Sequence, residues 1–307
     1  MDTLAVATRN HPPRTRRTLT SSEIRAWDSC QKKWWFRYHE ELVPQRGVKV
    51  LSYGQAVHAG LEAIHNGQKP EPAIQAVLGE TTWMADETPY VLAEATALVE
   101  KYVEHDPVKE MGHTVEATEC QFSVPLRTPA GRRWPLIELH AKIDLTTRDG
   151  YGNLWIWDHK TSATALKPQW LPLNDQMGFY YWAMAQLGER PVGIVYDLIR
   201  KPSIQPRKGE SADAWKVRLS VDIDTRPEFY YQRAEIVKSA DELDAIGADL
   251  WEAAHKIGAG RIRRNPSHCQ LMGCAYTDLC TADSLLIRSA GYKHERAHSE
   301  LELEVVA

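Results

Sequence analysis

The chain has 307 residues, of which 43% are hydrophobic and 25% are charged, so it is long enough and apolar enough to bury a substantial core. No apolar run approaches the roughly 20 residues that cross a bilayer, and the N-terminus lacks the apolar core of a secretory signal. We therefore expect neither a membrane protein nor a secreted one, and place the chain in the cytoplasm. The formal net charge of −4 argues against general attraction to nucleic acid.

The first part of the chain has a helical pattern. Residues 1–17 combine two prolines with basic side chains and show no periodicity, which predicts a flexible arm. A helix is expected from Thr20, because Thr20 and Glu23 match a capping box and apolar residues then recur at steps of three and four as far as Tyr38. Further helices are predicted over 54–67, 71–80 and 91–105.

The middle of the chain changes to strand-like alternation. The segments TVEATECQFSVPL, WPLIELHAKIDLTT and NLWIWDHKT are separated by turn clusters at TPAGR and RDGYGN. After them we expect a helix over about 169–188, strands over 192–200 and 216–223, and a long helix over about 227–257. The acidic end of the chain, HSELELEVVA, is predicted to be loose.

The predicted hairpin around RDGYGN brings two carboxylates together. If its turn centres near Tyr151, residues whose numbers sum to 302 face each other, and Asp144 and Asp158 then project from one face about 5 Å apart. Because alternate residues of a strand project from the same face, Lys160 lies on the same face as Asp158. Carboxylates this close repel unless a cation such as Mg²⁺ lies between them. The pattern fits a metal-dependent nuclease site, but on the hairpin alone a surface hairpin with a cross-strand patch of charge is the preferred interpretation.

Four of the five cysteines indicate a second site. Cys269, Cys274 and Cys280 lie within twelve residues, and Cys30 lies more than 200 residues upstream on the first amphipathic helix. Disulfides are rare in cytosolic proteins, so the trio points to a metal or a cluster. Four thiolates suit either an iron–sulfur cluster or a structural zinc ion. Separate buried thiols are the alternative, and this is our interpretation of Cys120, on a predicted strand.

Taken in order, these motifs resemble the RecB-like branch of the PD-(D/E)XK nuclease superfamily, and specifically its iron–sulfur exonucleases of the AddB, CRISPR-associated and phage types. The resemblance implies an α/β fold of the restriction-endonuclease type, in which a mixed central sheet is flanked by helices. It also implies the following division: an arm (1–17); a nuclease domain (18–282) with a helical lobe (18–110), a catalytic sheet core (111–225) and a long helix with the cysteine segment (226–282); and a C-terminal tail (283–307).

The same resemblance implies the catalytic residues. The motif YGQAVHAGLE supplies His58 as a metal ligand, AKIDL supplies Asp144, and WDHKT supplies Asp158 and Lys160, with the main-chain carbonyl of His159 as a further ligand. The metal is expected to be Mg²⁺ or Mn²⁺. Without the hairpin, an exposed pair between His58 and the glutamate four residues later would be the preferred interpretation, and with the hairpin the metal ligand is preferred.

The resemblance also implies DNA contacts and a second cofactor. QMGFY supplies Gln176 and Tyr180, which share one helical face that lies beside the DNA in the family, unless they only cap a packed helix. Arg263 and Arg264, just before the cysteine trio, are expected to contact phosphates. A 4Fe–4S cluster, with structural Zn²⁺ as the alternative, is expected on the remaining four positions: Cys30, Cys269, Cys274 and Cys280.

The expected activity is hydrolysis of phosphodiester bonds at DNA ends, favouring single strands, in recombination, repair, phage replication or CRISPR adaptation. Two other functions stay open: a DNA-end-binding module without nuclease activity, and a partner subunit of a recombinase or helicase. The chain has no Walker-type phosphate loop, so it is not itself expected to be the motor.

Overall fold

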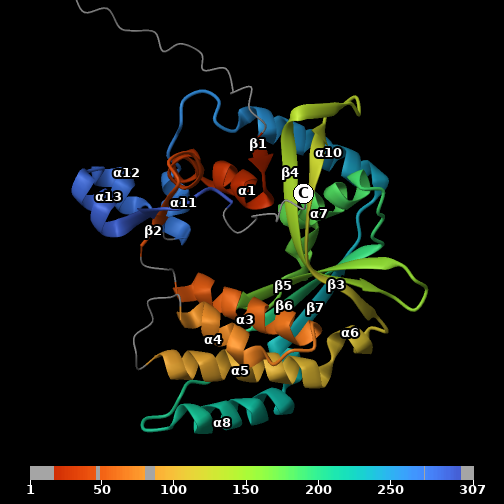
Figure 1. The fold of residues 1–307 in the computed structure, drawn as a ribbon, viewed down its shortest axis with the longest axis vertical. Coiled ribbons are helices and arrows are strands. Elements are labelled where there is room, and N and C mark those ends of the chain that lie inside the picture. The colour runs from red at the N-terminus through yellow and green to blue at the C-terminus, as the bar shows by residue number, and fades with distance from the viewer. Residues whose placement is uncertain (1–16, 46–48, 80–86, 273, 299–307) are drawn as a thin grey trace, which may run out of the picture. The chain divides into compact units, whose positions relative to one another are not determined.

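The computed structural model describes residues 17–45, 49–79, 87–272 and 274–298 (Figure 1). Contacts divide the chain into two compact units. Unit 1 consists of Met1–Gln45, Phe122–Ala141 and Ala240–Ala307, and unit 2 consists of Arg46–Gln121 and Lys142–Ser239. The predicted arm, except for Arg17, and the acidic end of the chain, except for His298, lie outside the described residues. The domain boundaries proposed from the sequence stay a prediction.

Unit 2 is built on a mixed sheet. The C-terminal part of β4 (Arg133–Arg148) pairs antiparallel with β5 (Leu154–Ser162), which pairs parallel with β6 (Gly193–Arg200), and β6 pairs antiparallel with β7 (Tyr231–Ile236). β3 (Thr114–Arg127) also pairs with β4, and both strands contribute residues to both units. The strands predicted over 113–160 and 192–200 are confirmed. So is the hairpin register, because Leu145 faces Trp157 and their numbers sum to 302.

Helices flank this sheet, as the α/β fold class predicts. The helices of unit 2 are α3 (Lys49–His65), α4 (Pro70–Gly79), α5 (Thr88–His105), α6 (Pro107–Glu110), the 3₁₀ helix η2 (Pro168–Leu173), α7 (Asp175–Gln186), α8 (Ala212–Thr225) and α9 (Pro227–Tyr230). α3, α4, α5 and α8 pack against one another in turn (Figure 1). No helix within the described residues is both long and apolar enough to cross a membrane.

The strand predicted over 216–223 is wrong, because this segment belongs to α8. Its apolar residues fit two periods at once: every second position is apolar from Val217 to Ile223, while Trp215, Leu219 and Ile223 are spaced by four. The structure buries the set spaced by four and leaves Val217 and Val221 66% and 60% exposed. The Ser211 hydroxyl caps the helix by accepting from the Ala214 N–H.

The long helix predicted over 227–257 is wrong in its first third. After the short α9, residues 231–236 form the edge strand β7, and the long helix is α10 (Ala240–Lys256). Pairing with β7 satisfies backbone groups of β6 that would otherwise be left without partners. That requirement comes from a strand more than 30 residues earlier, so the local pattern does not reveal it.

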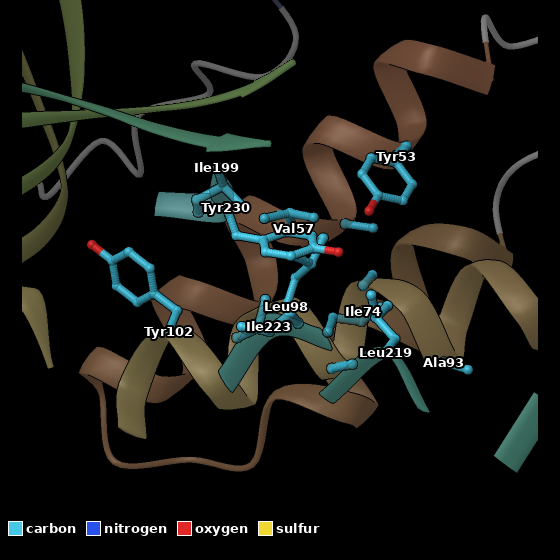
Figure 2. Packing of buried hydrophobic residues seen from close by; sticks show 14 of the residues in the cluster. Tyr53, Val57, Ile74, Ala93, Leu98, Tyr102, Ile199, Leu219, Ile223 and Tyr230 are labelled. Atoms are coloured by element: carbon cyan, nitrogen blue, oxygen red, sulfur yellow. The ribbon is translucent and has the colours of Figure 1, made fainter. Parts of the chain in front are cut away.

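The main core of unit 2 lies among α3, α4, α5, α8 and β6 (Figure 2). Val57, Leu98 and Leu219 come from three different helices and converge with Ile199 of β6 and Tyr230. Gly60 permits close packing of α3, since a Cβ there would lie 2.9 Å from side-chain atoms of Ile74. This core fixes α3 over the sheet, and α3 carries the predicted ligand His58.

Unit 1 consists mainly of short elements from both ends of the chain, together with the long helix α10. They are β1 (Arg17–Leu19), α1 (Ser21–Ser29), α2 (Gln31–Trp34), the π-helix η1 (Trp35–His39), β2 (Leu42–Pro44), α10, α11 (Pro266–Met272), α12 (Thr277–Ala282), α13 (Leu285–Gly291) and β8 (Tyr292–His294). β1 pairs parallel with the first part of β4, and β2 pairs antiparallel with β8. Part of the predicted tail over 283–307 is therefore regular structure.

The first helix begins as predicted but is not continuous. The Thr20 hydroxyl accepts from the Glu23 N–H at 3.2 Å, which confirms the helix start. At Cys30 the backbone is extended, with a φ of −166°, and this residue separates α1 from α2. The uninterrupted helix expected as far as Tyr38 is therefore wrong, because apolar spacing is maintained across a break in the backbone.

Glu23 is the centre of a buried polar network in unit 1. Its carboxylate accepts from Trp34 Nε1 at 2.9 Å, lies 2.9 Å from His298 Nε2 and pairs with Arg17. Burial alone would raise the pKa of Glu23, but His298, Arg17 and Trp34 outweigh it and hold the pKa below its ordinary value.

A carboxyl group with a lowered pKa in the folded state stabilises the fold at neutral pH. This contribution should be complete above the unfolded pKa of about 4.3 and lost as the pH falls through the lower folded value. We expect Glu23→Gln to lower the free energy of unfolding at pH 7 by about 1–3 kcal/mol and to flatten its decline below pH 4.3. Urea denaturation from pH 7 to pH 3 measures both effects. Parallel curves for the parent and the variant would exclude Glu23 as the titrating group.

Candidate active site

Asp144 lies where the β4–β5 ladder ends. The backbone pairing stops at Leu145 and Trp157. Beyond this point the Asp144 side chain replaces the backbone as acceptor, because its Oδ2 accepts from the His159 N–H at 2.8 Å. Burial opposes ionisation of Asp144, but His58, Lys160 and His159 outweigh it, so its pKa lies well below the ordinary range. Asp144 is therefore a fixed carboxylate near neutral pH.

Asp158, on the neighbouring strand β5, is fully buried, with a relative exposure of 0%. Lys160 Nζ lies 2.6 Å from Asp158 Oδ2, and apart from this ion pair neither oxygen has a hydrogen-bond partner in the described part of the chain. Burial, together with the nearby charge of Asp144, raises the pKa of Asp158. A buried carboxylate with so few donors is costly. The arrangement therefore has capacity for a further cation.

Lys160 lies near the carboxylates of Asp158 and Asp144. Its position beside Asp158 agrees with the alternation of side chains expected for the strand. Burial would lower the pKa of Lys160, but the charges of Asp158 and Asp144 outweigh it and raise that pKa above its ordinary value. The side chain is therefore an ammonium at neutral pH. It can stabilise negative charge but cannot serve as a general base.

His58 reaches the same carboxylates from α3. Its Nδ1 lies 3.7 Å from Asp144 Oδ1, beyond hydrogen-bond distance. Burial opposes protonation, yet Asp144 raises the net pKa of His58 above its ordinary value. Gly54, one turn earlier on the same helical face, explains the approach, since a Cβ there would meet Thr161 Oγ1 of β5 at 3.1 Å.

The side chain of His159 does not join this group. It is buried, and its Nδ1 lies 2.9 Å from Asp197 Oδ2 on β6. The second oxygen of Asp197 accepts from Arg233 Nε at 2.9 Å. The sequence analysis missed Asp197 and Arg233. The available signal was a single acidic residue in the otherwise apolar strand GIVYDLIR.

Gln176 and Tyr180 lie together on α7, and their predicted common face is confirmed. Gln176 Nε2 donates to the Tyr180 hydroxyl at 2.6 Å, and the Asn174 side chain caps the helix by accepting from the Gln176 N–H. Tyr180 is buried whereas Gln176 is half-buried. A direct role in DNA binding stays a prediction for both.

The four predicted cluster cysteines all belong to unit 1 and are free thiols. Cys30 is buried, and its Sγ accepts from the Asn265 N–H at 3.3 Å, while Asn265 Nδ2 donates to Ser29 O at 2.8 Å. Burial raises the pKa of Cys274 and of Cys280. The Cys269 and Cys30 thiols raise that of Cys274 further, and the other three thiols raise that of Cys280, which places the four within electrostatic range. Among the described residues, however, no group of three or more His, Cys, Asp or Glu is arranged to hold a metal ion. The cluster stays a prediction.

Arg263 and Arg264 are exposed beside α2. The Arg263 N–H donates to Gln31 Oε1 at 3.0 Å, and the Arg263 carbonyl accepts from the Lys32 N–H at 3.0 Å. With Lys32, Arg261 and Ile262 they line a hollow of about 540 Å³ that has no carboxylate in its wall. The hollow has the charge that a phosphate would require.

A family model described as the PD-(D/E)XK nuclease superfamily matches residues 18–281. The chain belongs to this superfamily and is therefore a phosphodiester hydrolase of the nuclease class, whose members generally use Mg²⁺ or Mn²⁺. No curated protein matches the chain.

Solved structures show the fold. The crystal structure of a "putative exonuclease" from Eubacterium rectale has a TM-score of 0.50 and 10% identity, over 84% of this chain and 86% of that one. The crystal structure of SSO0001 has a TM-score of 0.38 and 12% identity, over 89% of this chain and 90% of that one. The first likeness supports a mixed α/β fold, and the second is too weak to add to it.

Proposed function

We propose that the chain is a RecB-like exonuclease that hydrolyses phosphodiester bonds at DNA ends and favours single strands. The observation that carries this proposal is the buried Asp158 carboxylate, which has no hydrogen-bond partner among the described residues apart from its ion pair with Lys160 and lies near Asp144. The description of the Eubacterium rectale protein as an exonuclease agrees with it. Recombination, repair, phage replication and CRISPR adaptation are the processes proposed for such an activity.

The donor types suit a divalent cation, although the described side chains form no ready-made group of three metal ligands. The Asp144 and Asp158 carboxylates, the His58 imidazole and the His159 main-chain carbonyl would hold Mg²⁺ or Mn²⁺, since hard cations prefer oxygen ligands and Mn²⁺ accepts imidazole as well. A bound ion would supply charge neutralisation on the phosphate and a lowered pKa for an attacking water.

The protein's own groups have separate roles in this proposal. The His159 N–H occupies one oxygen of Asp144, so the other, Oδ1, faces His58. The Lys160 ammonium offsets the negative charge that develops on the phosphate. Gln176, supported by its hydrogen bond to Tyr180, is proposed to contact the DNA strand, as are the guanidinium groups of Arg263 and Arg264 in unit 1.

The four cysteines are proposed to hold a 4Fe–4S cluster, with Zn²⁺ as the lesser alternative. The effect of neighbouring thiols on the pKa of Cys274 and of Cys280 supports this. So does the contact between Cys30 and Asn265, because it already joins the early cysteine to the C-terminal segment. The role of such a cluster would be to hold distant parts of unit 1 together.

Digestion of end-labelled DNA tests the proposal. We expect purified protein to shorten linear single strands progressively in Mg²⁺ or Mn²⁺, to digest duplexes more slowly and to stop in EDTA. Asp144→Asn should lower the rate at least about 100-fold, because a fixed carboxylate is replaced by a neutral amide. Asp224→Asn is the matched control, since Asp224 is an exposed carboxylate on α8 that pairs with Lys101. Cutting of circular single strands at a similar rate would contradict exonuclease action, and the absence of all digestion would contradict the proposal itself.

A further inference from the structure

Two large apolar side chains are exposed on η2, the 3₁₀ helix that follows β5. Trp170 is 61% exposed and Leu173 is 71% exposed, although tryptophan is highly buried on average. Residues three apart in a 3₁₀ helix are eclipsed, so the two side chains stand side by side on one face. They form a continuous apolar surface with an indole ring in it.

The backbone beneath this surface is held rigidly. Leu171 is buried between the two exposed residues, and Pro168 and Pro172 fix backbone φ angles in the same turn. Lys238 Nζ donates to the Pro172 carbonyl at 2.6 Å, and the Leu166 N–H donates to Gln232 Oε1 at 2.7 Å. A surface that is ordered in advance loses little entropy when a ligand covers it.

The sheet register relates η2 to the candidate active site. Lys160 of β5 is paired with Leu198 of β6, and Leu198 is paired with Gln232 of β7. Directly paired residues project from the same face, so the Gln232 side chain that anchors Leu166 lies on the face of Lys160, two strand spacings or roughly 10 Å across the sheet. The chain that leads into η2 is therefore anchored on the face of the sheet that carries the ammonium group of the site.

The charge of the segment favours a polyanion. Residues 163–174, ATALKPQWLPLN, contain the exposed Lys167 and no acidic residue, and Lys238 adds a second ammonium beside Pro172. An indole flanked by cations suits nucleobases joined by phosphates, because any base can stack on the ring while lysines attract the backbone. A basic peptide would be repelled by the same lysines.

We propose that Trp170, together with Leu173, is a stacking platform for the bases of an unpaired nucleic-acid strand on its way to the site of Asp144, Asp158 and Lys160. This inference rests on the proposed function and deepens it, since it assigns the preference for single strands to a named surface. Bases in a duplex are already stacked on one another and cannot cover the indole, whereas a single strand offers free base faces.

The test measures binding without cleavage. A fluorescently labelled oligonucleotide of mixed sequence is titrated in EDTA with the parent, Trp170→Ala, Trp170→Phe and the control Tyr151→Ala, which removes an exposed aromatic ring from the β4–β5 turn. We expect Trp170→Ala to weaken single-strand binding about 5- to 100-fold, Trp170→Phe to retain most of it, and Tyr151→Ala to leave it unchanged. Blunt duplex binding should be the same in all four proteins.

Two results would overturn the platform alone. One is unchanged single-strand affinity in Trp170→Ala when the parent both binds and digests DNA. The other is dissociation of a dimer by Trp170→Ala in sedimentation experiments, which would assign the surface to a second copy of the chain. If the parent neither binds nor digests DNA, the proposed function fails and the platform fails with it.

Discussion

Lys160→Ala should reduce the rate of DNA digestion by about 100- to 1,000-fold, the range found when one preorganised charge-stabilising donor is removed from an active site. The ammonium lies 2.6 Å from Asp158, and its pKa is raised, so it carries full charge at the pH of the reaction. Initial rates on a labelled single strand at saturating Mg²⁺ measure the effect. The loss should appear mainly in kcat, because phosphate binding elsewhere is preserved.

Lys142→Ala provides the comparison for this variant. Lys142 is also a strand lysine of unit 2 that forms an ion pair with a carboxylate, that of Glu119. Its removal should change the rate less than about threefold, since this ion pair lies partly in solvent and includes none of the proposed metal ligands. An equal loss in the two variants, or a fall in the unfolding midpoint that accounts for the loss in Lys160→Ala, would remove the reason for assigning Lys160 to the reaction.

Asp197→Asn should lower the free energy of unfolding by about 3–5 kcal/mol, as expected when one partner of a buried ionic network is removed. Asp197 is completely buried, and its two oxygens separately contact His159 Nδ1 and Arg233 Nε, each at 2.9 Å. An amide has only one oxygen and no charge, so at least one of these partners loses its acceptor. Urea denaturation at pH 7 measures the change in free energy.

Asp224→Asn is the control for the stability measurement. Its carboxylate is exposed and pairs with Lys101, so the expected cost is below about 1 kcal/mol. Similar costs for the two variants would mean that the network around Asp197 does not stabilise the fold beyond an ordinary surface pair. A large cost for Asp197→Asn alone would establish the network as a structural support beneath the site.

The β4–β5 hairpin could be predicted because its information is local. Alternation of apolar residues marks the strands, RDGYGN marks the turn, and the turn position fixes which residues face each other. The observed pairing of Leu145 with Trp157 follows from these features alone. The proximity of Asp144 to His58 could not be predicted from local sequence alone, because it depends on the close approach of α3 that Gly54 permits.

The predictions that were wrong concern segments whose local structure is determined by contacts with distant parts of the chain. The segment over 216–223 fits strand and helix periods equally, and the packing of α8, with its buried Leu219 and Ile223, against α5 favours the helix. The segment over 231–236 becomes a strand because β6 offers it an edge. Asp197 was missed for a related reason: its partners come from β5 and β7, which the sequence does not place beside it.

The hydrogen bond from the His159 N–H to Asp144 makes chain folding and site assembly a single event. The carboxylate that is proposed to bind metal also accepts the hydrogen bond at the end of the β4–β5 pairing. It therefore reaches its position only after β4 and β5 have paired. A chain emerging from the ribosome, or one that has partly unfolded, therefore lacks the ligand arrangement. Cleavage capacity would be restricted to the fully formed protein without any separate inhibitor.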